Sequence, residues 1–293
     1  MNLNRRKFVQ VASVSLASAI LGKYRLVQRP KTFGNLVGGV VYEAQDSAEN
    51  RTPDENVEVL LDTMADNGCG IEQLIGPDAV VLIKINGQCN QRYVDIHSVG
   101  SDAFPTNEDT VKGIINKIRA QNGWNGKIVI CDNVHGDGGQ ELTDKRALGS
   151  GWVPQGSQNF HDLANLYDDV FISSWYQFEH STYDPPLVYP DYTPKEGYVH
   201  LGNEYEYMSS WSSRKTRPSY PIFKPDGWDE ETLIDYAKGI WDENTQQYTS
   251  RPLKVINTFI VKDHKQNDHG VSLAFKNFYG LFDKRHGNHG SSP

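Results

Sequence analysis

The stretch from Ala79 to Ile85, with the sequence AVVLIKI, is apolar except for one lysine and decides the fold of the chain. A continuous apolar run of this length, rich in valine and isoleucine, is typical of a strand buried on both faces of a parallel sheet. Further strands are predicted for four other runs: Leu36–Tyr42, Lys127–Cys131, Val170–Ser173 and Leu253–Val261. The central strands are therefore expected to lie inside the protein.

Segments with helical periodicity separate these strands. Apolar residues recur at helical spacing in Asp54–Asn67, which ends at Gly68, and in Val111–Ile118, which Thr106 caps and Gly123 ends. Further helices are predicted at Phe160–Leu166, at Asp229–Asp242 and from Gly270 onward. Strands that alternate with helices predict an α/β fold, with a mostly parallel sheet and helices on both of its faces.

Between Trp175 and Trp228 the chain is rich in tyrosine, proline and serine. This stretch is too long for a plain loop in a compact domain, so we expect an insertion that packs through its aromatic side chains. It serves either as a lid over a site or as a covering layer without contact to a substrate. We predict an export signal with a short linker over residues 1–29, then a single α/β domain over residues 30–293 that contains the insertion 175–228.

The composition indicates a globular chain and limits the kinds of partner and cofactor that it is expected to bind. The 293 residues are 38% hydrophobic, which is enough for a core, and they carry a formal net charge of −8. This acidic balance argues against a nucleic-acid surface spread over the protein. The three cysteines, Cys69, Cys89 and Cys131, form no C-x-x-C pair, so no iron–sulfur cluster is expected within the chain.

The N-terminus has the features of an export signal. Adjacent Arg5 and Arg6, followed by Phe8 and a short apolar run from Val11 to Leu21, resemble a twin-arginine signal. We therefore expect the twin-arginine export machinery as a partner and a periplasmic or otherwise exported location. No second apolar run of about 20 residues follows, so no stable membrane span is expected after processing. An ordinary amphipathic helix with a basic start is the alternative.

Polar residues that follow the predicted strands mark a candidate site. Parallel strands bring their carboxyl ends to one edge of the sheet, and α/β proteins bind ligands at that edge. We expect an anionic small molecule or a glycan to bind there. The candidate substrate-binding or cofactor-binding residues are Asn86, Asp132, Lys262 and Asn277, and the candidate catalytic residues are Lys84, His264 and Lys276.

Lys84 is the most informative of these residues, because an unpaired ammonium inside an apolar strand is costly. One interpretation is structural, with the ammonium paired to Asp132 on the neighbouring strand. The other is functional, with Lys84, Lys262 and Lys276 holding a carboxylate, phosphate or sulfate and Asn86 adding a neutral hydrogen-bonding group. Both interpretations remain open at this point.

Histidines after the last predicted strand suggest a second kind of chemistry. His264 and His269, together with Asp132, offer imidazole and carboxylate ligands of the kind that zinc, iron, nickel and manganese accept. Their spacing is not a diagnostic metal motif, so hydrogen-bonding histidines, or a general acid or base at His264, are alternatives. The cofactor is left unassigned, with a divalent metal as one option.

Several segments together resemble the domain of unknown function 362 family. The resemblance rests on VLIKIN at Val81–Asn86, the strand that ends at Asp132, Lys262-x-His264 and GVSLAFKNFYGLF at Gly270–Phe282. The family typically shows V-L-I-K-P-N, a later K-x-H and T-x-x-x-K-N-x-x-G. Here Ile85 replaces the proline and Ser272 replaces the threonine, and the ferredoxin-like cysteines that some members carry are absent.

The resemblance implies an α/β domain without a settled general activity. The positions that match the family pattern are Lys84, Asn86, Asp132, Lys262, His264, Lys276, Asn277 and Gly280. We expect an exported enzyme that acts on an anionic substrate or cofactor, with a metal as an optional element. The alternative is a non-catalytic periplasmic binding or accessory protein for an anion, a metal or a glycan.

Overall fold

The computed structural model describes the central part of the chain. It covers residues 52–86, 106, 108–132, 160–174, 192–201 and 219–258, together with short strands at 29–30, 40–41, 187–188, 207–208 and 215–216. The short strands form β1 (Arg29–Pro30) with β2 (Val40–Val41), and β8 (Tyr207–Met208) with β9 (Lys215–Thr216). The predicted export signal, most of the strand predicted at Leu36–Tyr42 and the helix predicted from Gly270 lie outside the described residues.

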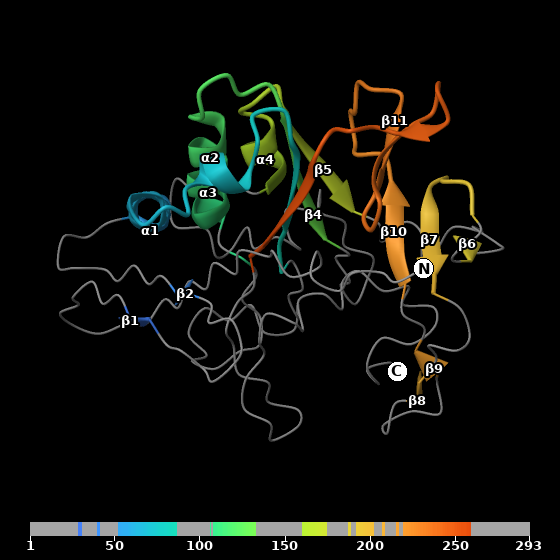
Figure 1. Cartoon of the computed structure of the whole chain (residues 1–293), viewed down its shortest axis with the longest axis horizontal. Helices are drawn as coiled ribbons and strands as arrows, with labels where there is room; N and C mark the ends of the chain where they lie inside the picture. Colours follow the sequence, from blue (N-terminus) through green and yellow to red (C-terminus); the bar gives the residue numbers. More distant parts are fainter. Residues whose placement is uncertain are drawn as a thin grey trace.

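A four-stranded parallel sheet forms the centre of the fold, as the apolar runs predict (Figure 1). All neighbouring strands in it are parallel, in the order β14-β3-β4-β5. The strands are β3 (Val80–Lys84), β4 (Lys127–Asp132), β5 (Val170–Ser174) and β14 (Leu253–Asn257). Because β3 is buried along its whole length, it is the central strand that its sequence predicts. The α/β class with a parallel sheet is therefore confirmed.

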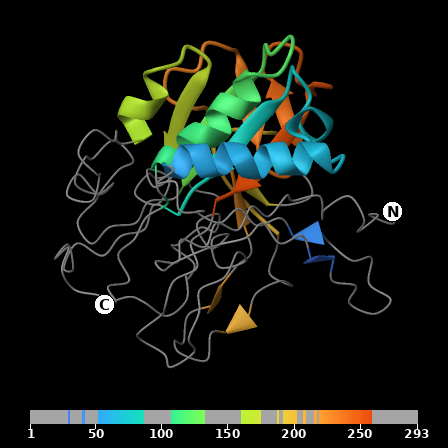
Figure 2. The same cartoon turned by 90° about the vertical axis from the view of Figure 1, so that its left-hand side faces the viewer.

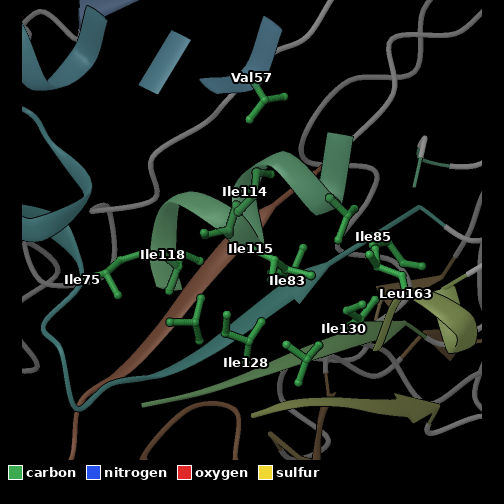
Figure 3. Packing of buried hydrophobic residues seen from close by; sticks show 14 of the residues in the cluster. Val57, Ile75, Ile83, Ile85, Ile114, Ile115, Ile118, Ile128, Ile130 and Leu163 are labelled. Atoms are coloured by element: carbon green, nitrogen blue, oxygen red, sulfur yellow. The ribbon is translucent and has the colours of Figure 1, made fainter. Parts of the chain in front are cut away.

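The described helices cover one face of this sheet. Figure 2 shows α1 lying in front of the other helices, with the strands behind them. The helices are α1 (Pro53–Asp66), α2 (Ile71–Leu74), α3 (Glu108–Arg119) and α4 (Phe160–Ala164). Isoleucines of α3, among them Ile115, point toward isoleucines of β3 and β4 (Figure 3), and all of them belong to one buried cluster. Three of the predicted helices are thus present with bounds close to those expected.

The opposite face of the parallel sheet is covered by a second sheet, which is mostly antiparallel. Its strand order is β13-β12-β11-β10-β7-β6, and only the β6 and β7 pair is parallel. Its strands are β6 (Leu187–Val188), β7 (Gly197–His200), β10 (Ser219–Phe223), β11 (Thr232–Asp235), β12 (Gly239–Asp242) and β13 (Gln247–Tyr248). Where the sequence predicts helices on both faces, the described part of the chain has helices on one face and this sheet on the other.

Apolar and aromatic side chains join the two sheets. One buried cluster contains Leu82 and Val129 of the parallel sheet together with Tyr198, Phe223 and Trp228 of the segment predicted as an insertion. The described part of that segment therefore packs through its aromatic side chains, as expected, and forms a layer of the core. In the described residues no helix is both long and apolar enough to cross a membrane.

The helix predicted at Asp229–Asp242 is wrong, because these residues form the hairpin of β11 and β12. Leu233 packs into one buried cluster and its neighbour Ile234 into another, which is the alternation of a strand between two layers. The chain then turns at Gly239, whose φ of 120° favours glycine. Packing against the parallel sheet therefore overrides the helical spacing of the apolar residues.

Helices α1 and α3 approach closely at Gly113. A Cβ at this position would lie 2.8 Å from the carbonyl oxygen of Asp54 and 3.0 Å from Cβ of Val57. Contacts this short force the neighbouring atoms to shift, and overpacking of this kind typically costs about 1–3 kcal/mol. The absence of a side chain at Gly113 thus permits the packing of the two helices.

We predict that Gly113→Ala lowers the free energy of unfolding by about 1–3 kcal/mol, although alanine is the better helix former by about 1 kcal/mol. Urea denaturation followed by circular dichroism measures the change. Asp66→Ala, at an exposed position in the last turn of α1, is the control and should not lower stability. A more stable Gly113→Ala variant would contradict the close approach.

Candidate functional site

The parallel sheet ends in a row of polar residues on the face that meets the second sheet. The preceding row on that face is apolar and consists of Val255, Leu82, Val129 and Phe171. The last row, which the strand registers align across the sheet, consists of Asn257, Lys84, Cys131 and Ser173. All four residues of this polar row are buried. The change from apolar to polar marks the carboxyl edge as the candidate site.

Lys84 is paired with Asp132, the partner that the structural interpretation predicts. Lys84 is 0% exposed, and its Nζ donates hydrogen bonds to Oδ1 of Asp132 and, at 2.7 Å, to the carbonyl oxygen of Ile85. Asp132 is also buried, so both charges lie away from water. A buried pair of this kind gives little net stability as a pair, but the loss of one partner leaves an uncompensated charge. The pair therefore fixes the ends of β3 and β4 relative to each other.

Two threonines hold the neighbouring chain segments at this edge. The backbone N–H of Thr258 donates to the carbonyl oxygen of Lys84 at 2.9 Å, and the hydroxyl of Thr106 donates to the carbonyl oxygen of Thr258 at 2.8 Å. The backbone N–H of Asn86 donates to the hydroxyl of Thr106 at 2.8 Å. Thr106, predicted from the sequence as a helix cap, therefore connects the ends of β3 and β14 just before α3.

Asn86 follows the last residue of β3 by two positions and is held by Thr106. Its backbone N–H and carbonyl groups are both occupied by Thr106, and its side chain is half-buried. Within the described residues the side-chain amide makes no hydrogen bond. Since an amide both donates and accepts, Asn86 can recognise a polar ligand at the edge.

Cys131 lies between Lys84 and Ser173 in the polar row, but it is not a reactive thiol. Burial raises the pKa of this thiol far above its ordinary value, and this effect outweighs the lowering by the nearby Lys84 ammonium. Its Sγ contacts the carbonyl oxygen of Ile83 at 3.7 Å. Cys131 therefore stays protonated, and since only the thiolate is nucleophilic, it acts as a small packing group.

Glu108 is a buried ionisable residue at the same edge that the sequence analysis does not single out. The pKa of its carboxyl group is raised to about 7, mainly by burial and to a smaller extent by the charge of Asp109, while a backbone hydrogen bond lowers it. Glu108 is the first residue of α3 and precedes Val111 by three positions and Ile115 by seven. That spacing places it on the stripe of α3 that faces the sheet, which is the signal that could have identified it.

Five predicted site residues fall outside the described residues: Lys262, His264, His269, Lys276 and Asn277. The described part of the chain contains no group of three or more histidine, cysteine, aspartate or glutamate residues arranged to hold a metal ion. Of the three predicted metal ligands it includes only Asp132, whose carboxylate pairs with Lys84. A metal at this edge stays a prediction.

Comparisons with known proteins identify no relative of this chain. No family model, no curated protein and no solved structure matches it. The resemblance to the domain of unknown function 362 family therefore stays a prediction, and the site is defined here by its geometry alone.

We predict that Lys84→Met lowers the free energy of unfolding by about 3–5 kcal/mol, because it leaves the Asp132 carboxylate buried without its partner. The double variant Lys84→Met/Asp132→Asn removes both charges and should lose less than half as much. Urea denaturation of both variants measures the difference. Equal losses would show that the ion pair does not account for the cost.

Glu108 should make stability depend on pH. Its folded-state pKa is raised above the unfolded value near 4.5, so the folded protein binds the proton more tightly between about pH 4.5 and about pH 7. Stability from this group is complete below that window and is lost as the pH rises through it, by about 3 kcal/mol. Thermal unfolding of the wild type and of Glu108→Gln across this range checks the prediction. Parallel pH profiles would contradict it.

Proposed function

We propose that this chain is an exported enzyme that acts on an anionic substrate or cofactor at the carboxyl edge of its parallel sheet. The observation that supports it most is the buried Lys84–Asp132 pair at the ends of two adjacent central strands. A buried ion pair contributes little to stability compared with apolar residues, so its presence at the ligand-binding edge of an α/β sheet favours a functional role. The predicted twin-arginine signal is the basis for the exported location.

In this proposal Asp132 positions Lys84 and keeps its charge balanced until a ligand binds. The ammonium then serves as a point charge for a carboxylate, phosphate or sulfate group, and the Asn86 amide supplies a neutral hydrogen bond. Since Lys84 and Asp132 are together neutral, the net attraction for an anion comes from the lysines predicted nearby, Lys262 and Lys276. His264 is proposed as the general acid or base.

A non-catalytic binding protein for an anion, a metal or a glycan is the second candidate. The observation in its favour is a pair of half-buried aromatic rings on the second sheet, Trp241 and Tyr248, whose centroids lie 5.0 Å apart in an edge-to-face arrangement. Partly exposed aromatic rings with polar tips are common in surfaces that bind other molecules. A measurement of substrate turnover distinguishes this binding protein from the proposed enzyme.

We predict that the full chain binds sulfate and that Lys84→Met/Asp132→Asn weakens this binding at least about tenfold, the loss expected for one charged hydrogen bond. Isothermal titration calorimetry measures the affinity. Lys127→Met is the matched control, because Lys127 is also ion-paired and largely buried but lies at the opposite, amino edge of β4. It should bind sulfate as the wild type does.

Equal weakening in the two variants, or no binding of sulfate, phosphate or acetate by the wild type, would overturn the proposed site. Aryl phosphate, aryl sulfate and aryl ester compounds then test turnover. Hydrolysis that is lost in the edge variant supports the enzyme, whereas binding without any turnover supports the binding protein.

A further inference from the structure

The contacts between the two sheets establish how the strands of the second sheet run relative to the parallel sheet. At the amino edge, Lys127 pairs with Asp229 and Glu230, and its Nζ lies 5.1 Å from the centroid of the Trp228 ring. Strand β11 begins at Thr232, just after these contacts, and therefore runs toward the carboxyl edge. Since β10 is antiparallel to β11 and to β7, strand β7 also runs toward the carboxyl edge.

Three residues of the second sheet consequently lie at the carboxyl edge. They are His200, the last residue of β7; Ser219, the first residue of β10 and its register partner; and Tyr236, which follows β11 directly. Figure 1 shows β7 and β10 on the side of the parallel sheet that lies away from the helices. His200 is 2% exposed and Ser219 is 4% exposed, so both lie within the protein.

Strand alternation determines the face on which these residues lie. Tyr198 packs into the cluster between the two sheets, whereas its neighbour Val199 packs into the cluster on the far face. Side chains two residues apart share a face of a strand, so His200 lies on the same face as Tyr198. The same reasoning places Ser219 with Phe223, on the face that meets the parallel sheet. Tyr236, in the turn directly after β11, packs against the cluster between the sheets and also against the cluster on the far face.

Electrostatic interactions place Tyr236 of the second sheet close to the polar row of the parallel sheet. Burial raises the pKa of the Tyr236 hydroxyl, and the nearby Cys131 raises it further. Cys131 in turn feels the charges of Lys84 and Asp132. Tyr236 of the second sheet and Lys84 of the parallel sheet therefore both lie close to Cys131, at the end of the layer between the sheets.

We infer that the site is built between the two sheets, with Tyr236 and His200 of the second sheet donating hydrogen bonds to the same anion that Lys84 holds. This inference rests on the proposed anion site at the carboxyl edge and adds to it a second wall, formed by Tyr236 and His200. Packed sheets lie about 10 Å apart, and the side chains of both walls occupy most of that space. The ligand that fits is a small oxyanion or the anionic end of a longer molecule that extends outward from the edge.

The turn that carries Tyr236 is fixed for this role. Oδ1 of the buried Asp235 accepts hydrogen bonds from the backbone N–H groups of Ala237 at 3.0 Å and Lys238 at 2.9 Å. Oδ2 of Asp235 accepts hydrogen bonds from the hydroxyls of Tyr192 and Tyr248, both at 2.7 Å. Because Asp235 and Tyr236 are consecutive, these four hydrogen bonds fix the start of the turn in which Tyr236 lies.

Sulfate titration of the full chain by calorimetry tests the inference. We expect Tyr236→Phe and His200→Leu, each of which removes the donor, to weaken sulfate binding at least about tenfold, the loss expected for one hydrogen bond to a charged group. Tyr167→Phe and His161→Leu are the matched controls, because both positions belong to the helix-covered side of the protein. They should retain the affinity of the wild type within about twofold.

A second measurement does not depend on the stability of the variants. Sulfate should shift the imidazole signals of His200 in a carbon–proton NMR spectrum of the wild type, with assignment by His200→Leu, and should leave those of His161 in place. Binding that is lost in Lys84→Met/Asp132→Asn but is unchanged in both second-sheet variants, with no shift at His200, would overturn the second wall alone. Absence of sulfate binding by the wild type would instead overturn the proposed anion site, and the second wall with it.

Discussion

The lysine in the central strand is the constraint on which the rest of this structure depends. Strand β3 is buried on both faces, so the Lys84 ammonium needs a charged partner inside the protein. Asp132 meets that need only if β4 lies beside β3 in the observed register, which aligns Lys84 with Cys131. The hydrogen bonds of Thr106 and Thr258 then close the same edge. One buried charge thus links the order of the strands, their register and the position of the candidate site.

The parallel sheet and the helices that cover it could be predicted from the sequence, because local patterns specify them. The apolar run of β3 identifies a fully buried strand, and the spacing in α1 and α3 identifies amphipathic helices. The sequence also offers Asp132 as a partner for Lys84, since a buried ammonium admits few partners, but it leaves open the alternative of a bound anion. The residues predicted at the C-terminal end, such as His264, lie outside the described residues and stay predictions.

The second sheet could not be predicted, because its strands are specified by contacts distant in sequence. Many of its aromatic residues are tyrosines, whose hydroxyl groups need hydrogen-bond partners that only the tertiary structure supplies, as Asp235 does for Tyr192 and Tyr248. From the sequence alone the segment therefore resembles an irregular insertion. In β11 the spacing of apolar residues fits a helix, but the parallel sheet on one side and a second cluster on the other select a strand. His200 and Tyr236 become candidates only once this layer is in place, since nothing in the sequence relates them to Lys84.

Observation of the Lys84 ammonium in solution is the most direct test of the buried pair at the carboxyl edge. Protein with nitrogen-15 in its lysine side chains gives proton–nitrogen signals for ammonium groups that exchange slowly with water. The structure predicts a slowly exchanging signal from Lys84, identified by Lys84→Met, that moves or disappears in Asp132→Asn. A Lys84 signal that exchanges as fast as those of exposed lysines, or one that Asp132→Asn leaves unchanged, would contradict the buried pair and the site built around it.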